Sequence, residues 1–182
     1  MLEQEEKITS VSVFYATNRE AKESDYGIQY GNGVSDFLHL GKSHVRFGDH
    51  LTTWDDLYLA STKADHSDPI NIRLVGTDER VRIKSDDLFS AQLNGAPSLE
   101  AYAALINKVL EKAIDKEIII YVHGAKGSFV KSVAMTAELD HFSGRDFIGF
   151  AYSWPSHQNI LSYITGSVRS IMKYGVPGLL CV

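Results

Sequence analysis

The sequence predicts an α/β fold in which antiparallel strands come first and parallel βαβ units follow. Before about Gly95, the apolar runs are short and several alternate with polar residues, as half-buried antiparallel strands do. After Pro97, apolar runs alternate with helical patterns, which is typical of a parallel sheet covered by helices. The 182 residues, 44% of them hydrophobic and 23% charged, are enough for one domain with a sizeable core. We expect residues 1–95 to be mainly β and residues 96–182 to form the βαβ units.

One strand stands out in the first half, and several weaker ones follow it. Val11–Tyr15 combines β-branched and aromatic residues, which favour strands. Residues 24–33 read as a loop, and Gly76–Glu79 reads as a hairpin loop between two of the weaker strands. The weaker candidates are Phe37–Leu40, Val45–Phe47, Ile70–Val75 and Val81–Ile83.

In the second half, helices and strands alternate. A helix is expected after Pro97, with Ser98 as its N-cap. The continuous apolar run Ile118–Val122 predicts a strand buried on both faces. A helix over Ser128–Phe142 then leads to a second buried strand over Phe147–Tyr152. We expect the two strands to be parallel neighbours in one sheet, which the first-half strands extend mainly in antiparallel fashion.

The end of the chain predicts two further elements. Gln158–Tyr174 is expected to form a third helix, interrupted at Gly166. Gly178–Val182 reads as the start of another strand. Cys181 is the only cysteine, so neither an internal disulfide nor a cysteine zinc cluster can form.

Charge and hydropathy exclude several functional classes. The formal net charge is −5 and there is no basic run, so we expect no nucleic-acid partner. We expect no membrane span, because no apolar run is long enough to cross a bilayer. The acidic, polar start is unlike a secretory signal, and we therefore expect a soluble cytoplasmic protein.

A histidine and a glycine, His123 and Gly124, end the first buried strand. Parallel sheets bind ligands at the carboxyl ends of their strands, and a glycine lets the backbone turn sharply there. Backbone N–H groups in such a turn can stabilise a developing oxyanion. A purely structural joint, in which the histidine only holds the loop, is the commoner explanation of the dipeptide taken alone.

Four separated motifs agree with one family in order and spacing. They are Val13–Arg19, Tyr121–Gly124, Ser128–Phe129 and Tyr152–Ser156. In this order they resemble a family of largely uncharacterised bacterial α/β-hydrolase-fold proteins, related to esterases and lipases. The resemblance covers residues from about Val11 to about Arg169. It implies an α/β-hydrolase fold and hydrolysis of an ester or similar acyl bond in a small-molecule substrate.

The resemblance also implies roles for individual residues. His123 and Gly124 would form the oxyanion turn, with the N–H of Ala125 as its donor. An aromatic residue and an asparagine usually follow this turn in the family, where this chain has Ala125 and Lys126. The upper edge of the sheet would be lined by Ser153, Trp154 and Pro155. No cofactor and no metal ion is expected.

One family motif is missing from the sequence. The nucleophile elbow Gly-x-Ser-x-Gly, which precedes the acid and the histidine of the triad in chain order, does not occur. We therefore expect an incomplete α/β-hydrolase domain, truncated before the elbow, with no catalytic residue and with His123 not acting as a general base. Two functions remain open. One is an esterase-like hydrolase in incomplete form, and the other is a non-catalytic truncated product or binding module.

Four polar residues in the first half of the chain are candidates for metal ligands. His39, His44, Asp49 and His50 are close in sequence, but their spacing matches no known ligand pattern. We interpret these residues as scattered polar surface.

Overall fold

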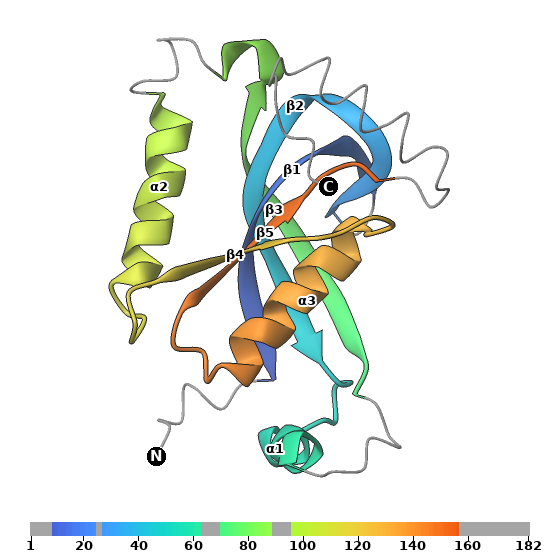
Figure 1. Ribbon diagram of the computed structural model, residues 1–182, viewed down its shortest axis with the longest axis vertical. Coiled ribbons are helices and arrows are strands. Elements are labelled where there is room, and N and C mark those ends of the chain that lie inside the picture. The colour runs from blue at the N-terminus through green and yellow to red at the C-terminus, as the bar shows by residue number, and fades with distance from the viewer. Residues whose placement is uncertain (1–8, 25–26, 63–69, 89–95, 157–182) are drawn as a thin grey trace, which may run out of the picture.

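The computed structural model describes residues 9–24, 27–62, 70–88 and 96–156, which form one mixed five-stranded sheet with helices against it (Figure 1). The predicted α/β class is confirmed. The strands are β1 (Ser10–Ser24), β2 (Gly27–Phe47), β3 (Ile72–Lys84), β4 (Ile118–Val122) and β5 (Ile148–Ser153). The helices are α1 (Trp54–Thr62), α2 (Pro97–Leu110) and α3 (Phe129–Phe142), with a short 3-10 helix at Ser85–Asp87.

The strand order is β3-β2-β1-β5-β4. β4 and β5 are parallel neighbours, as predicted, and β5 is also parallel to β1. β1, β2 and β3 pair antiparallel and extend the same sheet, which is likewise confirmed. The carboxyl ends of β1, β4 and β5 therefore lie at one edge of the sheet.

The first three strands are longer than their sequences predict. β3 runs straight through Gly76–Glu79 and pairs there with β2, so the predicted hairpin loop is wrong. β2 begins at Gly27, inside the stretch interpreted as a loop. The pairing of β3 with β2 is interrupted only by two register shifts, which lie on β2 between Leu40 and Gly41 and between His44 and Val45. Long-range pairing supplies hydrogen bonds that override the local turn preference of glycine and aspartate.

Alternate side chains of β1 point to opposite faces and divide the core in two. Tyr15 packs in the cluster that α3 covers, and Phe14 packs in the cluster that α2 covers. The Tyr102 hydroxyl of α2 donates to the carbonyl oxygens of Tyr15 at 3.2 Å and Gly41 at 2.9 Å, which fixes α2 against the sheet. The two helices thus cover opposite faces of the same strands.

The two long helices begin differently. In α3, the Ser128 hydroxyl accepts a hydrogen bond from the backbone N–H of Lys131, a normal N-cap. In α2 the N-cap is Ala96, without a side-chain cap, and Pro97 is the first residue. Ser98 is therefore not the cap. The fixed φ of proline suits the first helical position, which explains the earlier start.

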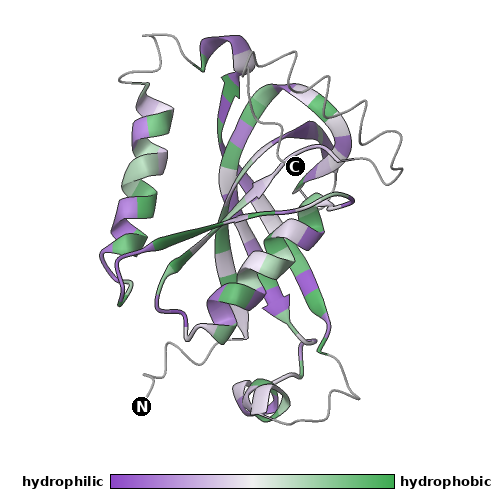
Figure 2. Ribbon diagram, viewed as in Figure 1, coloured by the Kyte–Doolittle hydropathy of each residue, from purple (hydrophilic) through white to green (hydrophobic). Residues whose placement is uncertain are grey.

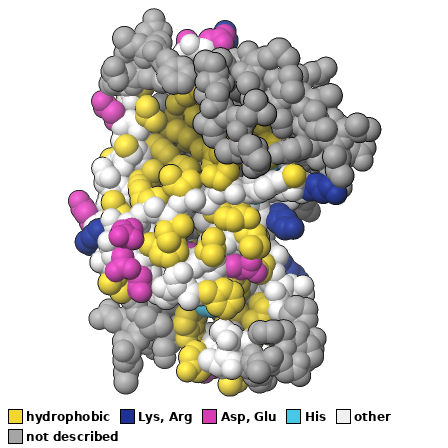
Figure 3. Space-filling model, viewed as in Figure 1, with side chains coloured by type: hydrophobic (Ala, Val, Ile, Leu, Met, Phe, Trp, Pro, Cys, Tyr) yellow, Lys and Arg dark blue, Asp and Glu magenta, His cyan; other side chains and the backbone are white. Residues whose placement is uncertain are grey.

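The prediction that Ile118–Val122 is buried on both faces is wrong for the described structure. β4 is an edge strand, and Ile120 and Val122 are 61% and 56% exposed. Figure 2 shows β4 as a hydrophobic ribbon, and in Figure 3 hydrophobic side chains gather over the middle of this face. Neither long helix covers β4 fully, because α3 packs mainly on β5 and β1.

Two predicted elements lie outside the described residues. They are the helix over Gln158–Tyr174 and the strand start at Gly178–Val182, which includes Cys181. Among the helices that are described, none is long and apolar enough to cross a membrane.

Candidate functional site

Three parallel strands bring polar residues together at their carboxyl ends. Tyr152 is level with Val122 of β4, so the segments that leave β5 and β4 meet directly. Thr17 of β1 is level with Ser153 of β5, which places Arg19 beside the same segments. Open α/β sheets bind ligands at this edge.

His123 and Trp154 lock the ends of β4 and β5 to each other. Their rings are stacked, with centroids 5.0 Å apart and planes 8° from parallel. The Trp154 indole N–H donates to the His123 carbonyl oxygen at 2.8 Å. His123 is only 5% exposed. The turn after β4 is therefore held in a fixed position relative to β5.

Arg19 lies beneath this turn and is completely buried. All five of its N–H donors have acceptors, although no described carboxylate forms an ion pair with it. Burial lowers the pKa of Arg19 to about 10, which leaves the side chain charged at neutral pH. The acceptors are Ser153 Oγ at 2.9 Å, Gly31 O and Asn32 Oδ1 at 3.0 Å, Gly127 O at 2.7 Å and His123 Nε2 at 3.2 Å.

The contact with Arg19 sets the protonation of His123. A guanidinium can only donate, so Nε2 of His123 must accept from it and Nδ1 must carry the proton. Nδ1 then donates to the carbonyl oxygen of Gly124 at 2.6 Å. Burial, reinforced by the nearby charge of Arg19, lowers the pKa of His123. The ring is therefore neutral, and its acceptor nitrogen is already engaged. The backbone carbonyl oxygen of Trp154 also lies 2.9 Å from Nε2. It would accept a hydrogen bond from that nitrogen only if the ring were protonated.

The glycine on which this turn depends is Gly127, which lies outside the predicted His-Gly pair. A Cβ at Gly127 would overlap the His123 ring, whereas a Cβ at Gly124 would meet nothing within 4 Å. The steric role expected of Gly124 is therefore not found. The only sequence signal was a second glycine three residues after the His-Gly pair. Between them, Lys126 adopts a left-handed conformation (φ 65°).

The other residues predicted for the site lie at different depths. Ser153 is fully buried and hydrogen-bonds Arg19 and Ser132, so it supports the edge from below. Trp154 and Pro155 are half-buried, and Gly124 and Ala125 are exposed. The structure thus brings a solvent-facing turn and a buried positive charge together. Such an arrangement favours negative charge developing at the turn.

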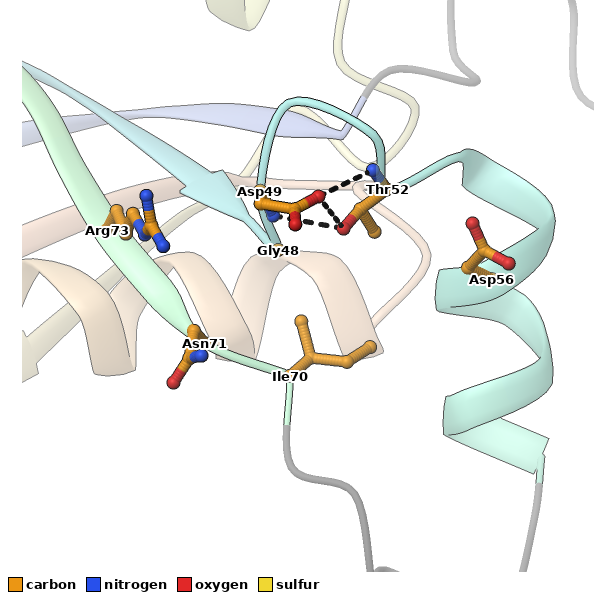
Figure 4. Close-up of a pocket in the computed structure, with 7 residues that line it drawn as sticks. All are labelled: Gly48, Asp49, Thr52, Asp56, Ile70, Asn71 and Arg73. Atoms are coloured by element: carbon orange, nitrogen blue, oxygen red, sulfur yellow. Dashed lines mark hydrogen bonds between the residues drawn. The ribbon is translucent and has the colours of Figure 1, made fainter.

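A cavity of about 280 Å³ lies at the opposite end of the sheet, beyond β2 (Figure 4). Its Asp49 carboxylate already accepts from the backbone N–H groups of Leu51 and Thr52 and from the Thr52 hydroxyl. These local bonds shape the turn into α1 and leave the cavity separate from the His123 turn. Within the described ranges, no three His, Cys, Asp or Glu residues gather to hold a metal ion.

Residues 98–176 match the model of a family described as alpha/beta hydrolase of unknown function (DUF900). This match confirms the resemblance to an uncharacterised α/β-hydrolase family. It includes the His123 turn, α3, β5 and Trp154, whereas Val13–Arg19 lies before it. No curated protein and no solved structure shows significant similarity to the chain.

Proposed function

Because residues 98–176 match an α/β-hydrolase family, we propose that this chain forms the oxyanion side of a site that hydrolyses ester or similar acyl bonds. The substrate would be a small molecule bound above the carboxyl ends of β4 and β5. The observation that carries the proposal is the locked turn after β4, in which His123 stacks on Trp154. We also infer that residues 1–182 form one partial hydrolase domain, since strands from both halves share a sheet.

In this proposal each residue has a defined part. The N–H of Ala125 donates to the oxyanion, and His123 and Gly124 shape the turn that presents it. Trp154 and Pro155 border the substrate, while Arg19 adds a positive potential from below. A single preorganised donor of this kind is worth about 3 kcal/mol in a complete site.

The nucleophile is the missing part. No Gly-x-Ser-x-Gly occurs in the 182 residues, and His123 has no free acceptor nitrogen for general-base work. The second candidate is a non-catalytic binding module that keeps the turn without the chemistry. Both candidates predict no esterase activity of this chain at the His123 turn. Ligand binding at the turn is the property that can separate them.

Two measurements test the proposal. The purified chain is assayed against short p-nitrophenyl esters beside His123→Ala and Ser153→Ala, and we expect no turnover that depends on either residue. A titration with a short carboxylate, which resembles the product, is then followed by ¹⁵N NMR. We expect the Ala125 amide to shift and the Gly76 amide, on β3, to stay unchanged. A carboxylate that leaves the whole turn unperturbed would contradict the oxyanion assignment.

A further inference from the structure

A second polar cluster, on β2 and β3, holds a serine, a histidine and a carboxylate in one hydrogen-bonded line. Ser35 Oγ lies 3.1 Å from His39 Nε2, and His39 Nδ1 lies 2.7 Å from Glu79 Oε2. We propose that Ser35, His39 and Glu79 form a catalytic triad in which Ser35 is a nucleophile toward neutral esters with a small apolar acyl group. This inference is independent of the function proposed for the His123 turn.

The carboxylate decides which nitrogen of His39 carries the proton. An ionised Glu79 can only accept, so Nδ1 of His39 donates to it and Nε2 presents a lone pair to Ser35. Ser35 Oγ therefore donates to Nε2. The same oxygen accepts the backbone N–H of Phe37 at 3.0 Å, a bond that strengthens as negative charge develops on it.

The surroundings keep both partners in the required states. Glu79 also accepts from the Tyr30 hydroxyl and from Arg82 Nε, each at 2.8 Å. Although burial raises it, these bonds hold the pKa of Glu79 below its ordinary value. Burial lowers the pKa of His39, which is only 2% exposed, so its ring is neutral and able to accept a proton.

The backbone around Ser35 is irregular and open to solvent. In the β1–β2 pairing, Thr17 is opposite His39 and Arg19 is opposite Val34. Residues 35–38 of β2 therefore lie opposite only residue 18 of β1, which makes a large bulge. Bulges occur next to active sites, where they re-aim a side chain. Here the bulge turns a half-buried serine toward a histidine four residues further on.

An exposed aromatic ring lies beside the histidine of this cluster. Phe37 is 39% exposed, and the centroid of its ring lies 6.4 Å from that of His39. Exposed apolar side chains beside a polar group suit a ligand with an apolar part. They support the choice of a small apolar acyl group as the part of the substrate that the site would recognise.

The reaction proceeds in two balanced steps. Ser35 Oγ bonds to the carbonyl carbon while its proton moves to His39 Nε2, and the bond to the leaving alcohol breaks as that alcohol takes the proton from His39. Water then bonds to the acyl carbon and gives a proton to His39. The acyl–Ser35 bond breaks, Ser35 recovers the proton and the carboxylic acid leaves.

An alkyl fluorophosphonate tests the nucleophile directly on the full chain. Attack by Ser35 forms a P–O bond and releases fluoride, and tandem mass spectrometry locates the adduct. We expect labelling of Ser35 in the native protein, none in Ser35→Ala, and labelling slower by about 100-fold in His39→Ala and Glu79→Gln. Circular dichroism establishes that each variant is folded.

The chain contains its own matched control. Ser12 Oγ lies 3.1 Å from His44 Nδ1 on β1 and β2, and no carboxylate in the described part of the chain hydrogen-bonds this histidine. Ser12 should stay unlabelled, and Ser12→Ala should label at Ser35 like the native protein. Equal labelling of Ser12 and Ser35, or no adduct on Ser35 of the folded chain, would overturn the proposal.

The pH profile separates base catalysis from a structural role. The groups that face His39 are Glu79 and Arg82 from β3 and Tyr30 from β2. The labelling rate should fall as the pH drops and His39 becomes protonated. A pH-independent rate would refute a base role even if His39→Ala fails to fold. Turnover of p-nitrophenyl acetate should depend on His39 and not on His123, which distinguishes this site from the His123 turn.

Discussion

Gly127 shows at the scale of one residue how backbone space fixes a functional side chain. Its carbonyl oxygen accepts from Arg19 Nη2 at 2.7 Å and from the Ser156 hydroxyl at 2.6 Å, so the residue cannot easily move away. A methyl group there would overlap the ring of His123. We expect Gly127→Ala to destabilise the protein by about 2 kcal/mol through overpacking, measured by urea unfolding.

Gly124→Ala is the control for that substitution. The space beside Gly124 is open, and its φ is not left-handed, so we expect a change within about 0.5 kcal/mol. The Gly127→Ala protein should also lose the near-ultraviolet circular dichroism of the stacked Trp154. Equal effects of the two substitutions would show that the His123 ring does not limit the space at Gly127.

Arg19 shows why a buried charge can be kept without a carboxylate. An isolated charge is costly to bury, but each N–H of this guanidinium has an acceptor on β2, β5 or the His123 turn. A lysine could not reproduce this planar set of five donors. The side chain thereby ties together three segments that are distant in sequence.

At the scale of the element, α2 and α3 differ in how their first turns are satisfied. The Ser128 hydroxyl caps α3, whereas Ser98 lies inside α2 and caps nothing. We expect Ser128→Ala to lower the free energy of unfolding by about 1 kcal/mol, measured by thermal or urea unfolding.

Ser98→Ala is the matched substitution in the other helix. Since alanine has the higher helix propensity, we expect it to be neutral or slightly stabilising, by a few tenths of a kcal/mol. A loss at Ser98 as large as that at Ser128 would restore Ser98 as the cap that its sequence position predicts.

β4 shows the limit of reading burial from an element's own sequence. Its β-branched residues and its length predict a strand correctly. Burial depends on which elements lie beside and above the strand, and that information is absent from the run itself. In the described structure β4 has a paired neighbour on one side only, β5, and its side chains stay largely exposed.

For the whole molecule, buried titratable groups predict how stability depends on pH. Burial lowers the pKa of His39, His123 and His141. A histidine with a lowered folded pKa contributes stability that is present above its unfolded value of about 6.5 and is lost as the pH falls through its folded value. We expect the free energy of unfolding to decline in this window, measured by urea unfolding at several pH values.

Asp140 changes the stability in the opposite direction as the pH varies. Burial raises its pKa to about 6, and its Oδ1 has no hydrogen-bond partner among the described atoms. Its contribution is present below its unfolded pKa of about 3.8 and is lost as the pH rises through about 6.

Asp140→Asn removes this opposing contribution. We expect the variant to be more stable than the native protein by about 2 kcal/mol at pH 7.5, because no buried carboxylate ionises. Its stability should also fall more steeply below pH 6. Parallel curves for the variant and the native protein would show that Asp140 does not titrate in this range.

The sequence by itself determined the α/β class, the parallel pair β4–β5 and the position of the His123 turn. These follow from local information: β-branched runs, helical periodicity and a His-Gly pair after a strand. The family resemblance rested on the same local motifs. It also placed Trp154 near the turn, although the sequence could not show that the two rings stack.

Only the tertiary structure decided the rest, because contacts between distant residues have no local signature. Pairing with β2 carries β3 through Gly76–Glu79, where the sequence predicts a turn. His39, interpreted from its spacing as polar surface, is buried because Glu79, forty residues away, supplies its acceptor. Arg19 reaches the His123 turn across 104 residues of sequence. Local preference sets which elements form, whereas long-range pairing and burial set which side chains meet.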